Sequence, residues 1–223
     1  MTESVLSFVH TVASNIETFD ALVAELAPDI PVRHTVQGDL LTQALDAGEL
    51  TADIRRQAAE AVVNEAENGA AVVLCTCSTV GPGADDAAGL TATKVMRIDR
   101  PMAEAAVRIG TRIGVVATLA TTLGPTLDLL SEAAVQAGKE TDLRPVVFEE
   151  ARDKLLAGDM ENYLTIIAEG LHLTASDSDV IVLAQASMSP ALKLCEDIEV
   201  PILSSPRSGL AAAIDTYKSI FAG

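Results

Sequence analysis

Cys77 stands where an apolar segment gives way to a short turn of small polar residues, glycine and proline. The apolar residues 71–74 before it are typical of a parallel strand that helices cover on both faces. In an open α/β sheet, chemistry gathers at the carboxyl ends of such strands. Backbone N–H groups and the hydroxyls of Ser78 and Thr79 are donors that hold a carboxylate and favour a thiolate. We therefore interpret Cys77 as a reactive thiol and Cys75, inside the apolar segment, as a core residue.

A second polar group follows the first apolar segment of the chain. His10 and Thr11 come directly after it, and His10 is open to three interpretations: a neutral hydrogen-bond donor, a second base, or a histidine at a strand end. Ser14 and Asn15 are explained as capping residues of a helix, with Glu17 completing a capping box. Because a helix N-terminus offers both free N–H groups and a favourable dipole, capping and carboxylate binding can coexist there.

Two later turns carry further candidates for binding an anion. Thr118, Thr121 and Thr122 follow an apolar segment, and their hydroxyls suit either carboxylate recognition or local turns and a helix start. Arg207 follows the last apolar segment and is the best placed cation for an anionic substrate, because a guanidinium binds a carboxylate through two parallel hydrogen bonds. The alternative for Arg207 is a surface ion pair.

The composition excludes several classes of protein. A chain of 223 residues with 49% hydrophobic residues can form one large domain or two small lobes. A net charge of −17 argues against a nucleic-acid or anionic-membrane partner, and residues 5–9 are too short an apolar segment to span a bilayer. Three cysteines without a signal segment predict a cytoplasmic protein. The sequence shows no metal-ligand cluster and no phosphate-binding glycine motif. His34 and His172 are expected to face solvent or a helix surface.

Apolar segments alternate with helical patterns from end to end, which is typical of βαβ units and a mainly parallel sheet. Strands are expected at residues 4–9, 31–36, 70–76, 112–117, 143–148, 179–184 and 200–203. Helices are expected between residues 14 and 28, 51 and 69, and 99 and 110, from residue 189, and after residue 206. The Gly-rich residues 80–86 are interpreted as a mobile rim of the site.

The order of these elements repeats along the chain. A strand ending at His10 leads through helix, strand and helices to the strand ending at Cys77, and the same order leads from Thr118 to Gln185. Both pairs are 67 residues apart, which predicts two similar lobes. We expect an α/β fold of two pseudo-symmetric lobes, each with a mainly parallel sheet flanked by helices, whose polar turns line a shared cleft. The first lobe is predicted at 1–98, completed by a C-terminal helix at 205–223, and the second at 99–204.

The turn Cys77-Ser78-Thr79 resembles the Cys-Asn-Thr motif of the aspartate/glutamate racemase superfamily, which includes hydantoin racemases, maleate isomerases and arylmalonate decarboxylases. The two-lobed repeat is similar to that family's fold over nearly the whole chain. The resemblance implies an isomerase that needs neither pyridoxal phosphate nor a metal ion. In two-base members, one cysteine from each lobe stands on either face of the substrate carbon, which implies that Cys77 is the acid and base of the first lobe. The family also implies a homodimer or higher homo-oligomer.

The chain departs from the family at the second cysteine. Residues 181–192 resemble the strand and turn of the second lobe, but Gln185-Ala186-Ser187 stands where a Gly-Cys-Thr-like segment is expected. The resemblance therefore places Ala186 and Ser187 in the substrate-binding turn and Gln185 at the position of the second thiol. A glutamine can donate hydrogen bonds to an oxyanion but cannot accept and return a proton near neutral pH. Cys195 falls in the following helix and is interpreted as a core residue.

The resemblance and the single thiol together predict a cofactor-independent enzyme in which Cys77 transfers a proton at a carbon next to a carboxylate. The expected substrate is an amino acid or a small dicarboxylate. Two alternatives remain open. One is a decarboxylase or other lyase that uses the single thiol to protonate an enolate. The other is a carboxylate-binding protein without turnover, in which packing alone retains Cys77.

Overall fold

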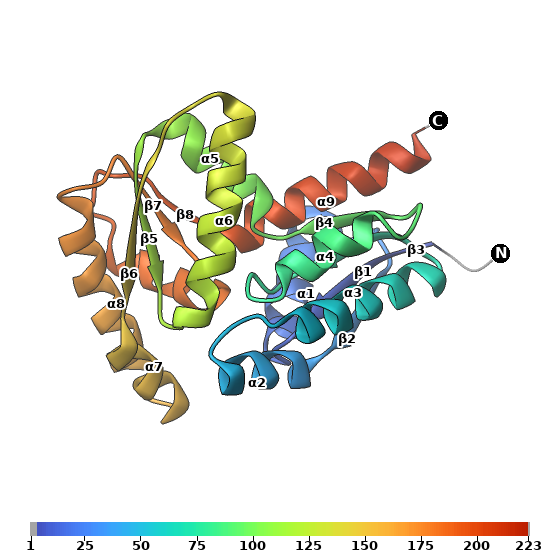
Figure 1. The fold of residues 1–223 in the computed structure, drawn as a ribbon, viewed down its shortest axis with the longest axis horizontal. Helices are drawn as coiled ribbons and strands as arrows, with labels where there is room; N and C mark the ends of the chain where they lie inside the picture. The colour runs from blue at the N-terminus through green and yellow to red at the C-terminus, as the bar shows by residue number, and fades with distance from the viewer. Residues whose placement is uncertain (1–3, 223) are drawn as a thin grey trace. The chain divides into compact units, whose positions relative to one another are not determined.

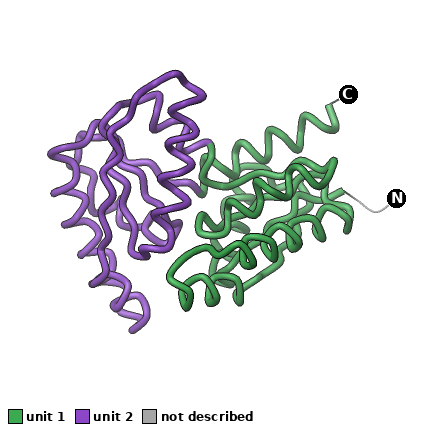
Figure 2. The backbone as a smooth tube through the Cα atoms, in the orientation of Figure 1, with its two compact units in different colours: residues 1–100, 206–223 green, residues 101–205 purple. Residues whose placement is uncertain are grey.

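The structure, a computed structural model, describes residues 4–222. These residues fall into two compact units (Figure 2): unit 1 is Met1–Arg100 with Pro206–Gly223, and unit 2 is Pro101–Ser205. Each unit contains one four-stranded sheet, and all strand pairs in both sheets are parallel. Helices flank both sheets (Figure 1). The predicted α/β class, with two mainly parallel sheets, is therefore confirmed.

Unit 1 is a sheet between two helical layers, and it contains β1 (Val5–His10), α1 (Asn15–Leu26), β2 (Val32–Val36), α2 (Gly38–Ala47), α3 (Ala52–Glu67), β3 (Ala70–Cys75), α4 (Gly81–Ala88), β4 (Lys94–Arg97) and α9 (Ser205–Phe221). The strand order is β2-β1-β3-β4. Alternate side chains of the central strands serve opposite faces. Val9 and Cys75 pack with α2, α3 and α4, whereas Phe8 and Leu74 pack with α1 and α9.

Unit 2 repeats this arrangement with α5 (Arg100–Ile109), β5 (Arg112–Ala117), α6 (Ala120–Ala137), β6 (Asp142–Val147), α7 (Glu149–Leu156), α8 (Met160–Ala175), β7 (Val180–Leu183), the 3-10 helix η1 (Ala186–Leu194) and β8 (Ile202–Ser204). The strand order is β6-β5-β7-β8. Val115 and Val182 pack with α5 and α6 on one face, and Val116 and Leu183 pack with α7, α8 and η1 on the other.

Strand register shows which positions of the two units are equivalent. Val9 of β1 pairs with Cys75 of β3, and Val116 of β5 pairs with Leu183 of β7. Two residues beyond these pairs, Cys77 and Gln185 occupy equivalent places in their units. By the same count, the equivalent of Thr118 in unit 1 is Thr11 and not His10. The strand pairing therefore differs by one residue from the pairing of His10 with Thr118 that the sequence spacing suggested.

Seven of the eight strands in residues 4–222 lie where the sequence predicted them. The exception is β4, a strand of four residues whose ends, Lys94 and Arg97, are charged and interrupt any apolar run.

Local predictions at two helix starts are wrong. Ser14 has a helical backbone and makes no side-chain bond that caps α1, so there is no capping box. The helix expected from residue 189 begins at Ala186 as a 3-10 helix that includes Pro190.

The prediction of a mobile rim at residues 80–86 is also wrong, because most of this segment forms α4. Gly83 lets α4 approach α3 closely: a Cβ atom at this position would lie 2.6 Å from the Cβ of Ala58 and 2.7 Å from the carbonyl oxygen of Arg55. Gly83 thus serves helix packing. No helix within the described part of the chain is long and apolar enough to cross a membrane.

Candidate active site

Cys77 lies in the turn between β3 and α4. It is half-buried, whereas the other two cysteines, which also lie in the described residues, are buried. The turn is held at its start by the N–H of Thr76, which donates to the carbonyl oxygen of Val9 at 3.0 Å, and further along by the N–H of Gly81, which donates to the carbonyl oxygen of Ser78 at 3.2 Å. The thiol therefore has a fixed backbone and partial access to solvent, and partial exposure is one of the conditions for a reactive cysteine.

The two other thiols belong to the core, as predicted. Cys75 is 2% exposed and Cys195 is 5% exposed, and each packs within an apolar cluster of its own unit. Burial raises the pKa of Cys75 to about 12, and burial also raises the pKa of Cys195. Both residues are therefore neutral thiols at physiological pH, and neither has the environment of a proton-transfer group.

His10 ends β1 and belongs to a hydrogen-bonded chain of four side chains. Its Nδ1 lies 2.7 Å from Oγ1 of Thr76, and its Nε2 lies 2.8 Å from Nδ1 of His34 on β2. Nε2 of His34 lies 3.1 Å from Oδ1 of Asp20 on α1. We refer to these four residues as the Asp20–Thr76 chain. It runs from an exposed carboxylate to the residue directly before Cys77.

Two phenylalanines enclose the imidazoles of this chain. The ring of Phe8 stacks on His34 at a centroid distance of 4.8 Å and on His10 at 5.8 Å, and Phe19 contacts His10 at 5.5 Å. Burial, reinforced by His34 and opposed by Asp20, lowers the pKa of His10 to about 4. His10 is thus a neutral imidazole at physiological pH, buried, with both nitrogens engaged. Of the two surroundings expected for His34, solvent or a helix surface, it has the second: its side chain is only 12% exposed and contacts Asp20 of α1.

The remaining unit 1 candidates divide into buried and exposed groups. Thr11, Ser78 and Thr79 are buried just beyond the carboxyl ends of β1 and β3. Ser14 is exposed and Asn15 is half-buried at the start of α1. The hydroxyls beside Cys77 are therefore part of the packed strand ends.

In unit 2, Gln185 joins the ends of β5 and β7. Its Oε1 accepts hydrogen bonds from the N–H of Thr118 at 2.6 Å, from the N–H of Leu119 at 3.1 Å and from the Thr118 hydroxyl at 3.1 Å. These N–H groups immediately precede α6, so the glutamine oxygen holds the backbone segment that leads from β5 into the helix. This fixes the amide so that only its nitrogen is left to donate to another group.

Tyr163 of α8 extends this polar cluster. Its hydroxyl lies 2.8 Å from Oγ of Ser187, which is exposed at the start of η1. Burial raises the pKa of Tyr163, and hydrogen bonds with Ser187 and Thr118 oppose that change. Sequence reasoning did not find Tyr163, because a single aromatic residue on a helix has no local signal of its partners.

Other predicted residues of unit 2 have separate surroundings. Thr122 is buried, and Ala186 is half-buried beside Gln185. Thr121 is half-buried, but its Oγ1 atom is inaccessible to solvent and has no hydrogen-bond partner in the described residues. The polar cluster is therefore made of Thr118, Gln185, Ser187 and Tyr163. The other three predicted residues lie beside it in the sequence.

The cations have acidic partners. Arg207 binds both carboxylate oxygens of Glu25 at 2.8 Å in an exposed pair, which is the alternative weighed for it. Arg97 is 4% exposed and binds Asp99 through two hydrogen bonds of 3.0 Å and Asp85 at 2.9 Å. Burial opposes the charge of Arg97, but its acidic partners prevail and raise its pKa above the ordinary value. Both guanidiniums are therefore already engaged by carboxylates of this chain.

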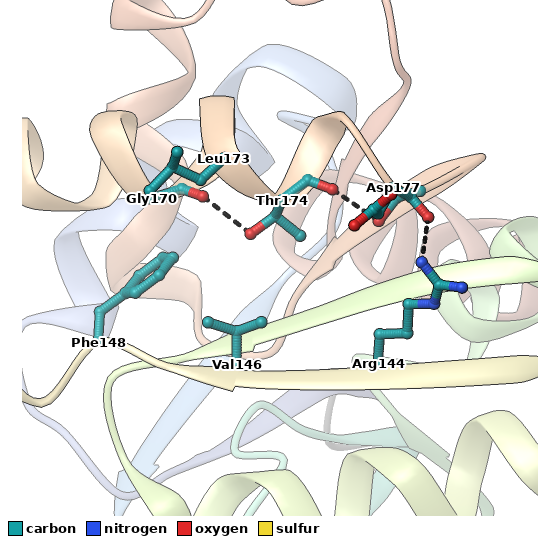
Figure 3. A pocket seen from close by; sticks show the side chains of 8 residues that line it. Arg144, Val146, Phe148, Gly170, Leu173, Thr174 and Asp177 are labelled. Carbon is teal, nitrogen blue, oxygen red and sulfur yellow. Dashed lines mark hydrogen bonds between the residues drawn. The ribbon is translucent and has the colours of Figure 1, made fainter.

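A surface pocket of about 300 Å³ in unit 2 is separate from these residues. Figure 3 shows it between β6 and α8, lined by Arg144, Val146, Phe148, Gly170, Leu173, Thr174, Asp177 and Ser178. The Arg144 guanidinium donates to the carbonyl oxygen of Asp177 at 2.7 Å beside it. None of the predicted site residues lines this pocket, so it is not the candidate site. Among residues 4–222, no three His, Cys, Asp or Glu side chains are grouped to hold a metal ion.

Comparisons with known proteins point to one family. A family model described as Asp/Glu/hydantoin racemase matches residues 7–213, and no curated protein matches the sequence. A solved structure of a candidate Asp/Glu racemase from Yersinia pestis is 16% identical with a TM-score of 0.73, covering 96% of this chain and 99% of its own. A glutamate racemase from Bacillus anthracis is 15% identical with a TM-score of 0.69, and the match covers 100% of this chain and 83% of the racemase. An arylmalonate decarboxylase variant in a sulfate-associated form is 16% identical with a TM-score of 0.62, and the match covers 96% of this chain and 93% of the decarboxylase.

Proposed function

Because the chain belongs to the Asp/Glu/hydantoin racemase family, we propose that it is a racemase-type enzyme in which Cys77 transfers a proton at a carbon adjacent to a carboxylate. The observation that carries this proposal is the position of Cys77. It is the half-buried thiol at the carboxyl end of a central parallel strand, in a turn whose backbone is held by hydrogen bonds. The buried Cys75 and Cys195 are excluded from this role by their surroundings.

The proposed substrate is an amino acid or small dicarboxylate. The charge of the chain is strongly negative, and Arg97 and Arg207 are bound to carboxylates. Backbone N–H groups of the turn after Cys77, with Ser78 and Thr79, are therefore proposed to hold the substrate carboxylate. Each donor contributes one hydrogen bond rather than a full opposite charge. A few such donors are enough for a small anion to bind.

The proposed step is the transfer of one proton. The Cys77 thiolate takes the α-proton and becomes a thiol, while the electron pair of the broken C–H bond forms an enolate stabilised by hydrogen bonds. The thiol exchanges its proton with solvent and then returns a proton to the same carbon, which becomes deuterated in D2O. Gln185 enters as a hydrogen-bond donor through its amide nitrogen, because a carboxamide cannot accept a proton from carbon and return it near neutral pH. A single thiol thus favours exchange with retention of configuration.

A lyase is the second candidate, and the single thiol is the observation that favours it. In that reaction the bond from the α-carbon to a carboxylate breaks, carbon dioxide leaves, and the electron pair stays on the enolate. Cys77 protonates the carbon from one face, and the resulting thiolate regains its proton from water. The likeness of the fold to arylmalonate decarboxylase is consistent with such chemistry but does not select it.

Incubation in D2O with a panel of amino acids, dicarboxylates, hydantoins and malonates separates these reactions. Deuterium at the α-carbon with retained configuration supports the single-thiol mechanism, and release of carbon dioxide identifies the lyase. Rapid inversion of configuration would require a second acid and contradict the role given to Gln185. Binding of carboxylates without exchange or product would mean that the protein has no turnover.

A further inference from the structure

The Asp20–Thr76 chain admits two complete arrangements of its protons. In the first, the Thr76 hydroxyl donates to Nδ1 of His10, and the Nε2–H of His10 donates to Nδ1 of His34. The Nε2–H of His34 donates to Asp20. Both imidazoles are neutral, and each of their nitrogens has a partner of the right kind.

One additional proton gives the second arrangement. With His34 as an imidazolium, its Nδ1–H donates to Nε2 of His10, so the proton of His10 must reside on Nδ1. The Nδ1–H of His10 then donates to Oγ1 of Thr76. The Thr76 hydroxyl in turn donates to the carbonyl oxygen of Val9, which lies 3.2 Å away. The bond from His34 to Asp20 has the same direction in both arrangements.

We propose that His34 and Asp20 are positioning residues for Cys77, and that the uptake of one proton by His34 reverses both hydrogen bonds of His10 and redirects the Thr76 hydroxyl. Thr76 directly precedes Cys77, and its N–H and hydroxyl both bond to Val9 at the end of β1. The proton state of the histidine pair is thereby transmitted to the backbone that carries the thiol. The catalytic consequence of this inference rests on the proposed function of Cys77.

The surroundings decide which imidazole takes the proton. His34 faces the Asp20 carboxylate from α1, and this carboxylate is 56% exposed. His10 faces His34 from β2, Thr76 from the turn directly after β3, and the uncharged rings of Phe8 and Phe19. Burial holds the pKa of His10 near 4, so a second positive charge beside His34 is strongly disfavoured. His10 is therefore the imidazole of the pair that stays uncharged when one proton is added.

Nitrogen NMR of the intact protein labelled with 15N-histidine tests the reversal directly. The chain has three histidines, and His172, which lies in unit 2 and bonds to Ala168 and Asp197, serves as an internal reference. On lowering the pH, we expect His34 to become an imidazolium while His10 changes from the Nε2–H to the Nδ1–H tautomer at the same midpoint. A His10 tautomer that stays unchanged while His34 titrates would overturn the inference.

Two conservative variants of α1 complete this test. Asp20→Asn removes the carboxylate and should move the shared midpoint to lower pH by roughly half to one pH unit, because an exposed charge acts weakly. Glu17→Gln removes an exposed acidic residue on the same helix and should leave the midpoint unchanged. An equal effect of both substitutions would mean that general charge, and not contact with His34, controls the transition.

Activity supplies a separate readout. For a substrate that shows Cys77-dependent exchange, the pH profile of kcat should follow the NMR transition and move with Asp20→Asn. If the pH profile of kcat is the same in Asp20→Asn as in the wild type, the positioning role is contradicted and the proposed function remains intact. Absence of any exchange would contradict the proposed function, while the NMR experiment, which needs no substrate, would still decide whether the chain reverses.

Discussion

Cys75 and Cys77 are only two positions apart in the chain, but the first thiol is buried and the second is half-buried. Cys75 is the last residue of β3 and lies in the core, whereas Cys77 lies beyond the strand in a turn. The difference arises because helices cover the strand on both faces but leave its carboxyl end open. His10 illustrates the opposite case: it also stands at a strand end, but its ring is enclosed by Phe8 and Phe19.

The exposure of the thiols predicts their order of modification. Iodoacetamide applied to the folded protein should label Cys77 first, because Cys75 and Cys195 are 2% and 5% exposed. Peptide mapping by mass spectrometry identifies the labelled residue, and the denatured protein, in which all three thiols react, is the control. Faster labelling of Cys75 or Cys195 in the folded protein would be inconsistent with the assignment of the reactive thiol.

The burial of His10 predicts how stability depends on pH. The unfolded chain binds a proton at His10 near pH 6.5, whereas the folded protein resists protonation until about pH 4. Stability should therefore fall as the pH is lowered through this window, by an amount on the order of 3 kcal/mol. A His10→Asn variant lacks this loss, so its deficit relative to the wild type, measured by urea unfolding, should shrink toward pH 4. The exposed His172→Asn variant is the control, and a constant deficit for His10→Asn would contradict the prediction.

At the scale of elements, the sequence predicted seven of the strands because apolar runs report buried parallel strands. It missed β4, where charges stand at both ends of a short strand. It also missed the partnership of His10 and His34, which depends on the pairing of β1 with β2 and the packing of α1. That register aligns Phe8 with His34 and stacks their rings, and no local pattern in the sequence specifies it.

Gln185 gives a prediction at the same scale, because it connects β7 to the start of α6. Gln185→Ala leaves the N–H groups of Thr118 and Leu119 without their acceptor and should lower the free energy of unfolding by about 1 to 3 kcal/mol. Gln185→Glu keeps the accepting oxygen and adds a negative charge near a helix N-terminus, so it should retain most of the stability. Equal losses of unfolding free energy in the two variants would show that the oxygen acceptor of Gln185 does not stabilise the fold.

At the scale of the whole molecule, the resemblance stated from the Cys77 turn and the element repeat agrees with the family match over residues 7–213. The repeat in the sequence corresponds to two sheets with the same strand order. Substrate identity does not follow from these features, because a few hydroxyl and N–H donors suit many small carboxylates. The predicted homo-oligomer likewise stays a prediction, which light scattering can test.

The net charge of −17 predicts how salt affects an anionic substrate. A negatively charged protein repels a dicarboxylate at low ionic strength, and salt screens this repulsion over about 10 Å at 0.1 M. We expect kcat/KM for a dicarboxylate to rise roughly twofold or more as the ionic strength increases from about 10 mM to about 300 mM. A neutral amide analogue is the control and should show little change. A fall in kcat/KM with salt would instead indicate a local cationic site for the carboxylate.

The most direct measurement of the central claim is α-proton exchange in D2O, followed by proton NMR, with the substrate that the panel identifies. The wild type, Cys77→Ala and Cys195→Ala are compared at equal concentrations of folded protein. If Cys77 is the proton-transfer group, Cys77→Ala loses exchange by about a hundredfold or more, and Cys195→Ala retains it. Exchange that persists in Cys77→Ala at the wild-type rate would contradict the account.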